Sequence, residues 1–275
     1  MHLVRVLGES LGLLKKEPKV FFPRIITSIL YTFFILYLTR IAIEVSFAVN
    51  REIGMAESLG TAPDISRALS QFSGELPLFV FFFIITFVSD VLSYGMFVVI
   101  SRDFHENRKI SLIRAFKDSV SRARVLFLVS VLATIFVGFF VGIYLIFGRM
   151  YIMTRSPLFL ALALAVIALA VILFALVFFF AVPVAMVEDR GAKSAIMKSA
   201  SLGIKHMRPV LMANLLFFCM MLVVMLALVI TKFQGAVAIS AIFVFILGRI
   251  AQVIIYTYIS IVNPSLYLSI EEVER

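Results

Sequence analysis

Long, uninterrupted runs of apolar residues dominate the pattern of this chain. Each run is longer than the roughly 20 residues with which an α-helix crosses a bilayer, and only helices or closed barrels satisfy every backbone group in hydrocarbon. Barrel strands would alternate over about 10 residues, whereas these runs are continuous. The pattern predicts an all-α integral membrane protein with six transmembrane helices, at residues 20–49, 76–100, 125–148, 157–187, 209–231 and 235–262.

Three shorter segments show helical periodicity, with apolar residues on one face and Lys or Arg on the other. The apolar positions are Leu3, Leu7, Leu11 and Leu14, then Leu112, Phe116 and Val120, and then Ala195, Ser199 and Leu202. A helix of this kind lies in the headgroup plane with its apolar face towards the hydrocarbon. The sequence therefore predicts three cytoplasmic interfacial amphipathic helices.

An internal repeat is a further feature of the pattern. Ser10-Leu11-Gly12 followed by Pro18 matches Ser201-Leu202-Gly203 followed by Pro209, and a degenerate third copy surrounds Ser119. One interpretation is a threefold repeat of one interfacial helix and two spans. The alternative is that any short linker lying on a membrane acquires this pattern.

The composition of the chain adds to this prediction by excluding water-soluble folds. The chain is 63% hydrophobic and 15% charged, with a mean hydropathy of +1.11, which would give a water-soluble fold an insoluble surface. The longest polar segments, 50–75, 101–124 and 188–208, are too short to fold alone. We therefore expect a single polytopic membrane domain over residues 1–275.

The distribution of cations predicts the topology. Of the Lys and Arg in the loops and near the ends of the runs, 18, with Arg24 counted among them, lie at the two termini and in segments 101–124 and 188–208, against five in the other loops. By the positive-inside rule, both termini are cytoplasmic in a multi-pass protein of the cell membrane. The net charge of +9 thus follows from topology. It predicts contact with anionic headgroups on the cytoplasmic face rather than nucleic-acid binding.

Motifs that would indicate catalysis or metal binding are missing from the sequence. The three histidines, His2, His105 and His206, do not have the spacing of a zinc site, and no phosphate-binding glycine loop occurs. The single cysteine, Cys219, excludes an intrachain disulfide and a Cys-based metal cluster. We therefore expect no catalytic residues, no cofactor and no metal.

Two charged residues lie deep inside predicted spans. Asp90 and Arg249 each follow the start of their run by 14 residues, which places both about 21 Å deep at a 1.5 Å rise per residue. A charge at that depth costs about 2.5 to 3.5 kcal/mol even on insertion scales. Equal depth and opposite sign predict a salt bridge between the second and sixth spans.

Each of these charges belongs to a polar stripe. Thr86, Ser93 and Tyr94 share a face with Asp90, and Gln252 and Tyr256 share a face with Arg249, which Ser260 and Asn263 continue. One hypothesis is a polar groove that holds a headgroup or an ion. The alternative is a buried pair that only determines which helices meet.

The end of the fourth run carries a resemblance. Its apolar residues are followed by Pro183, the acidic turn of Glu188, Asp189 and Gly191, and then an Ala-x-x-x-Ser helix from Ala195. This pattern resembles a six-span membrane-domain family of unknown function, related to the membrane-embedded region of some glycerophosphodiester phosphodiesterases. The resemblance implies a six-helix membrane domain but no catalysis, because the soluble phosphodiesterase barrel is missing here.

The physics of the same segment predicts an elbow at the cytoplasmic end of the span. Pro183 lacks an N–H and bends or ends a helix, while Glu188 and Asp189 are favourable near the start of the next helix. A contact to a lipid headgroup or a partner is the alternative role of this elbow.

These observations favour a non-enzymatic membrane protein that contacts lipid, or moves a small substrate or lipid through a polar groove, alone or with a partner subunit. The alternative is a structural or assembly factor whose buried charges serve only helix packing. An intramembrane enzyme is a distant third. The sequence names no substrate, protein partner or oligomeric state.

Overall fold

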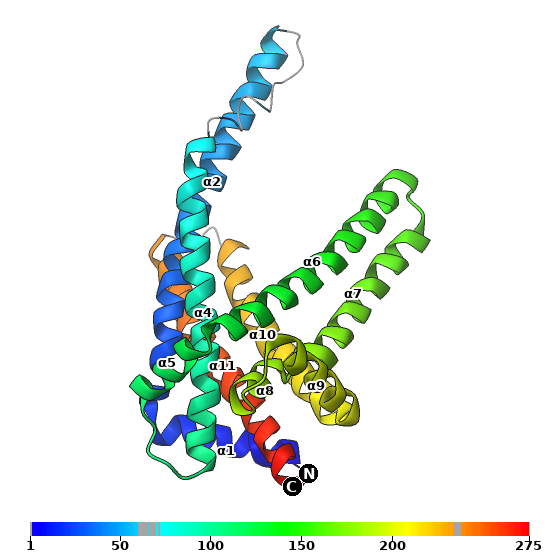
Figure 1. Cartoon of the computed structure of the whole chain (residues 1–275). Coiled ribbons are helices and arrows are strands. Elements are labelled where there is room, and N and C mark those ends of the chain that lie inside the picture. Colours follow the sequence, from blue (N-terminus) through cyan, green and yellow to red (C-terminus); the bar gives the residue numbers. More distant parts are fainter. Residues whose placement is uncertain (1, 60–65, 67–69, 71, 234–237, 275) are drawn as a thin grey trace. The chain divides into compact units, whose positions relative to one another are not determined.

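In the computed structural model, the described residues are 2–59, 66, 70, 72–233 and 238–274, and within these ranges the chain is helical and contains no strand (Figure 1). Continuous apolar runs form helices here because a helix satisfies its own backbone hydrogen bonds. The predicted all-α class agrees with this architecture.

Five stretches of the described chain are long and apolar enough to cross a membrane. The first combines η1 (Pro18–Phe21) with α2 (Phe22–Leu59), and the second combines η2 (Ser73–Glu75) with α4 (Leu76–His105). The others are α6 (Ala123–Thr154), α7 (Pro157–Phe178) continued by α8 (Ala181–Val187), and the greater part of α11 (Ala238–Glu274). They overlap the predicted first to fourth and sixth spans, although their ends differ from the predicted ones.

The predicted fifth span falls on α10 (Met207–Phe233). Its apolar stretch with described side chains, Met207–Leu222, is by itself too short to count as a span. The remainder of the predicted fifth span and the start of the sixth lie outside the described side chains. Five candidate spans are therefore described, and the predicted fifth span, on α10, stays a prediction.

The chain divides into two compact units. One unit consists of Met1–Arg24 and Val91–Arg275, and the other of Ile25–Asp90. In the smaller unit, α2 and the first part of α4 pack through aromatic rings, such as Tyr37 and Phe82 with centroids 5.3 Å apart. The Tyr37 hydroxyl donates to the Glu75 carboxylate at 2.9 Å, and Arg40 pairs with both Glu44 and Glu75.

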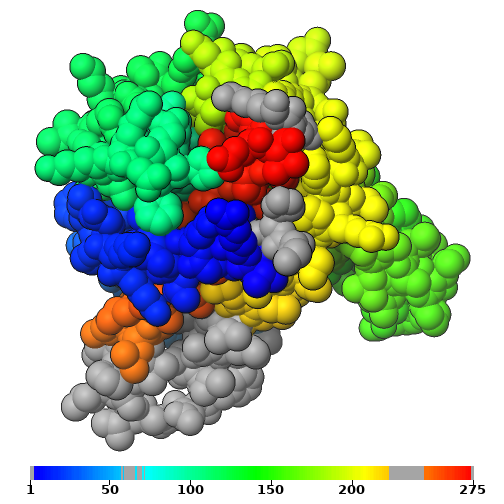
Figure 2. Space-filling model, turned by 90° about the horizontal axis from the view of Figure 1, so that it is seen from below, coloured from blue at the N-terminus to red at the C-terminus, as the bar shows by residue number. Residues whose placement is uncertain are grey.

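Three short helices occupy the positions predicted for interfacial helices. They are α1 (His2–Lys16), α5 (Leu112–Ser121) and α9 (Ala192–Lys205). In the larger unit, α1 lies against the C-terminal part of α11 (Figure 2). The helices exist as predicted, while their position in a headgroup layer stays a prediction.

The faces that these helices bury differ from the predicted stripes in two of the three cases. In α9 the expected Ala195, Ser199 and Leu202 are buried. In α5, by contrast, Phe116 and Val120 are exposed and the buried face consists of Ala115 and Ser119. Helix α1 likewise buries Val6, Ser10, Leu13 and Leu14, while Leu11 is exposed. In α5, small residues take the place of large ones at the contact, as is usual where helices approach closely.

The two Ser-Leu-Gly triplets of the predicted repeat do not have equivalent surroundings. A Cβ added at Gly203 would lie 2.1 Å from the backbone oxygen of Leu176 in α7, whereas one added at Gly12 would meet nothing within 4 Å. The buried serine of α9 is Ser199, and Ser201 of the triplet is exposed. The threefold repeat stays a prediction.

Candidate functional site

The fourth span is interrupted where the sequence predicts an elbow. Helix α7 ends at Phe178, two turn residues follow, and α8 begins at Ala181. Pro183 has no N–H, so it cannot donate to the carbonyl four residues earlier, which belongs to Phe179. The interruption lies at the buried end of the span, because Phe180, Ala181 and Val184 have no exposed surface.

Two side chains from other helices satisfy the backbone groups that the interruption frees. The Asn263 Nδ2 of α11 donates to the Phe179 carbonyl oxygen at 2.7 Å. The Ser199 Oγ of α9 accepts a hydrogen bond from the Phe180 N–H at 3.1 Å. Freed backbone groups in a span need such partners, so this interruption joins α7, α9 and α11.

An acidic residue follows the interruption and ties the same helices together. The Glu188 carboxylate accepts hydrogen bonds from Lys198 of α9, Tyr267 of α11 and Arg190. Burial favours the neutral acid, but the hydrogen bonds from Lys198 and Tyr267 outweigh it and lower the pKa of Glu188. The next residue, Asp189, has a positive φ of 57° and forms an ion pair with Arg122.

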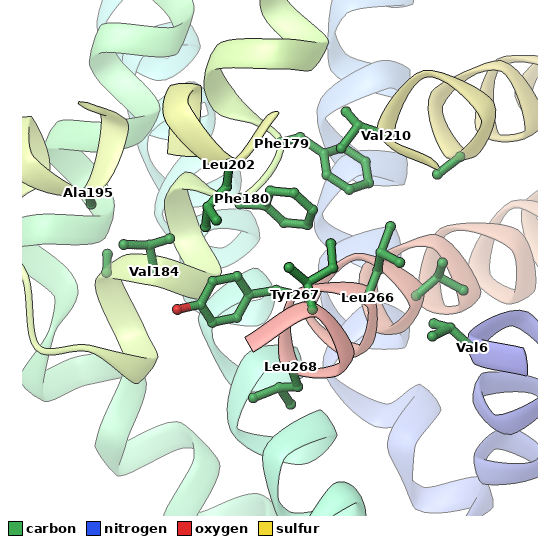
Figure 3. Close-up of a cluster of buried hydrophobic side chains, with 14 of the residues drawn as sticks. Val6, Phe179, Phe180, Val184, Ala195, Leu202, Val210, Leu266, Tyr267 and Leu268 are labelled. Carbon is green, nitrogen blue, oxygen red and sulfur yellow. The ribbon is translucent and has the colours of Figure 1, made fainter. Parts of the chain in front are cut away.

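The Tyr267 ring completes this connection on the apolar side. Figure 3 shows the ring beside Phe180 and Val184, with its hydroxyl pointing towards α8. The centroids of Tyr267 and Phe180 are 5.9 Å apart. The predicted elbow residues Pro183 and Glu188 therefore lie within one packed corner, whereas Asp189 is exposed at its edge and Gly191 is the N-cap residue of α9.

A buried arginine is a feature that the sequence analysis missed. Arg24, counted there as a loop cation, is 8% exposed and donates from Nη2 to the Ser260 Oγ at 2.7 Å. Its guanidinium lies 5.7 Å from the Phe97 ring centroid and 5.8 Å from that of Tyr256, within the range of cation–π attraction. Its place inside an apolar run, directly after Pro23, is the signal that could have indicated burial.

The predicted stripe on α11 contains both buried and partly buried residues. Ser260 and Asn263 are buried, Gln252 and Tyr256 are partly buried, and Ile250 and Ile254 are exposed on other faces. The partly buried Arg249 donates to the Gln252 Oε1 at 2.5 Å. Polar side chains thus follow one face of α11 for four turns.

The predicted stripe on α4 is divided between the two units. Thr86 is buried and donates to the Phe82 carbonyl at 2.7 Å in the smaller unit, which ends at Asp90. Ser93 and Tyr94 belong to the larger unit, where the Ser93 Oγ donates to the Pro23 carbonyl at 3.3 Å. Because Asp90 and Arg249 belong to different units, their pairing stays a prediction.

The larger unit also contains an apolar cavity between helices. It has a volume of about 510 Å³, within the size range of ligand pockets. Helix α6 contributes Phe136, Val137, Phe140, Val141, Tyr144 and Leu145, α7 contributes Ile167, Ala170, Val171 and Phe174, and α10 contributes Asn214. Asn214 donates to the Val210 carbonyl at 2.9 Å, and with Tyr144 it is one of the two lining residues that carry a polar side-chain group.

The described residues offer no constellation for metal chemistry. Within them, no group of three or more His, Cys, Asp or Glu side chains is placed to hold a metal ion. Several acidic residues of the larger unit form ion pairs with cations, such as Asp103 with Arg114 and Glu188 with Lys198.

Comparisons with known proteins leave the family of the chain open. No protein-family model matches it, and neither a curated protein nor a solved structure is significantly similar to it.

Proposed function

We propose that the protein is a non-enzymatic integral membrane protein that binds membrane lipid, with an acyl chain in the cavity between α6, α7 and α10. The observation that carries the proposal is the cavity itself, about 510 Å³ lined by ten hydrocarbon or aromatic side chains and one asparagine. It lies along candidate spans, so the acyl chains of membrane lipids would surround it.

The physics of a bilayer supports an occupied cavity. An acyl chain gains no hydrophobic free energy when it leaves bulk lipid, so shape and dispersion must favour the site. An empty space of this size would forfeit the dispersion contacts of every side chain around it. The Phe136 ring packs on Phe140 and Phe178 with centroids 4.9 and 5.4 Å apart, which gives this wall a defined shape.

The predicted polar groove belongs to the same proposal. If Asp90 and Arg249 meet, the stripes on α4 and α11 provide polar groups that accommodate a headgroup or a small substrate beside the lipid tails. The predicted cytoplasmic placement of α1, α5 and α9 is compatible with this arrangement, because Phe116 and Val120 of α5 are exposed and would rest in the headgroup layer.

The second candidate function is that of a structural or assembly factor. The observation that favours it is the fourth span, whose freed backbone groups are satisfied by Asn263 and Ser199. Buried polar groups serve helix packing there, and the buried Arg24 bonds to Ser260 in the same way. Under this alternative, the cavity would be filled by a partner helix.

Blocking the cavity tests the proposal. Ala170 lines it, and Ala168 of the same helix is exposed and does not. We expect Ala170→Trp to lower the number of lipids that co-purify with the protein, measured by native mass spectrometry, and Ala168→Trp to leave it unchanged. Thermal unfolding in detergent checks that both variants fold. Equal lipid retention in the two variants would contradict lipid binding in this cavity.

A further inference from the structure

A separate groove lies where the start of α9 approaches α6. It has a volume of about 590 Å³. Leu128, Val131 and Leu132 of α6 form one side, and Gly191, Ala192, Lys193, Ser194 and Met197 form the other. The spacing of the three α6 residues places them on one helix face. The surface inside the groove is almost entirely apolar, and Lys193 is the charged residue among those that line it. We call the end of the groove at the start of α9, where Lys193 lies, its polar end.

Cations border the polar end of this groove. Lys193 is part of the lining and is exposed. Arg124 is also exposed and lies on the same face of α6, four residues before Leu128. The neighbouring Arg190 is paired with Glu188, whereas no acidic side chain in the described part of the chain forms an ion pair with Lys193 or Arg124.

Backbone amides of α9 add to the polar end. The first helical hydrogen bond runs from the Ala195 N–H to the Gly191 carbonyl, at 2.9 Å, so the preceding amides have no acceptor within the helix. The N-cap Gly191 has no side chain to supply one, and the Ser194 hydroxyl donates instead to the Gly191 carbonyl at 2.9 Å.

We propose that this groove binds one anionic phospholipid, with its phosphate near Lys193 and Arg124 and an acyl chain along Leu128 and Leu132. The charge of the polar end excludes a preference for cationic groups, and no carboxylate lines the groove to hold a choline. Free phosphate would leave the apolar side without a partner. The proposal rests on lipid binding as the function, but it concerns a site other than the α6–α7 cavity.

The test compares two phospholipids on the full chain in detergent, by native mass spectrometry titration. We expect phosphatidylglycerol to bind more tightly than phosphatidylcholine with the same acyl chains. Lys193→Gln should weaken phosphatidylglycerol binding about fivefold, the factor that corresponds to about 1 kcal/mol for a cation near an anionic headgroup. The matched control, Lys16→Gln, removes an exposed cation of α1 and should change nothing.

Two further measurements test whether the groove binds the acyl chain as well as the phosphate. Met197→Trp narrows the groove from an exposed position and should weaken the binding of both phospholipids. Millimolar inorganic phosphate should not displace phosphatidylglycerol, because it uses only the polar end, and displacement would overturn the lipid assignment. Equal affinity for the two phospholipids, or equal effects of Lys193→Gln and Lys16→Gln, would also overturn it.

The proposals for the two lipid sites can be refuted independently of each other. If Ala170→Trp loses lipid while Lys193→Gln does not weaken phosphatidylglycerol binding, the anionic groove is refuted and the cavity stands. If Lys193→Gln weakens binding while Ala170→Trp retains its lipid, the cavity is refuted and the groove stands.

Discussion

Two regions of the larger unit have the same sequence pattern but different contacts. We call them the first corner, where α5 follows the end of α4, and the second corner, where α9 follows α7 and α8. In each corner an acidic residue lies near the end of a candidate span, Asp103 in the last turn of α4 and Glu188 directly after α8. Each accepts a hydrogen bond from a cation in the next short helix. In each, that short helix buries a small residue and, four positions later, a serine. The pairs are Ala115 with Ser119 in α5, and Ala195 with Ser199 in α9.

The difference between the corners lies in what each serine contacts. Ser119 lies against the uninterrupted α4 at Gly95, where an added Cβ would be 2.9 Å from its Oγ, and that hydroxyl has no hydrogen-bond partner in the described chain. Ser199 instead accepts from the Phe180 N–H of the interrupted span. The serine next to the interrupted span therefore satisfies a backbone group, whereas the serine next to the uninterrupted helix contributes only packing. Equal sequence patterns therefore do not imply equal energetic roles.

The largest expected effect comes from the closest backbone approach in the second corner. Gly203→Ala would bring a Cβ within 2.1 Å of the Leu176 carbonyl oxygen, and since backbone cannot move aside cheaply, we expect a loss of about 3 kcal/mol or more of unfolding free energy. Gly95→Ala would press mainly on the Leu126 side chain, at 2.7 Å, and should cost less. Reversible unfolding in mixed micelles measures both.

The control for this pair is Gly12→Ala in α1, where the new methyl meets nothing within 4 Å. We expect it to stabilise by about 0.5 to 1 kcal/mol, the ordinary gain of alanine over glycine in a helix. A loss at Gly12 comparable with that at Gly203 would show that the two Ser-Leu-Gly triplets pack alike, and would revive the threefold repeat.

The second prediction sharpens the contrast between the serines. Ser199→Ala strands the buried Phe180 N–H and should cost about 1 to 3 kcal/mol. Ser119→Ala removes a hydroxyl that has no partner among the described residues, so it should be neutral or slightly stabilising. The same unfolding assay compares them. Equal losses of unfolding free energy would mean that the two hydroxyls contribute equally to stability, which would contradict the difference between the two corners.

The third and smallest effect is a pH dependence at the second corner. Because the folded pKa of Glu188 is lowered, its contribution to stability is complete above the pKa of the unfolded chain and is lost as the pH falls through the folded value. Glu188→Gln should therefore reduce the fall in melting temperature between pH 7 and pH 4. Glu17→Gln, at a partly exposed position between α1 and η1, is the control. An unchanged acid response would contradict this role of Glu188.

The sequence predicted the elements better than their contacts. Apolar runs and amphipathic periodicity were sufficient to place five spans and three short helices, and Pro183 indicated the elbow, because these signals are local. The partners of Arg24 and Asn263 were not predictable. Ser260 and Phe179 are 236 and 84 residues away from them, and hydropathy does not determine which helices meet.

The buried faces of the short helices show the same limit. Periodicity assigned Phe116 to the apolar face of α5, but it did not indicate that Ala115 and Ser119 are the residues that this helix buries against the rest of the protein. In a membrane protein, exposed apolar side chains are not penalised, and close helix contacts favour small residues. Hydrophobicity alone therefore identifies the residues that are buried between helices less reliably here than in a soluble protein.

The α6–α7 hairpin (Figure 1) has a consequence for biosynthesis. Only Arg155 and Ser156 separate the two helices, and Arg155 adopts a positive φ of 54°, so the pair would enter the bilayer together. With the predicted topology, Arg149 and Arg155 must be carried outward against a membrane potential, at about 2.3 kcal/mol per charge per 100 mV. The hydropathy of 3.2 in Pro157–Val187, the highest among the candidate spans, provides the driving force for that translocation.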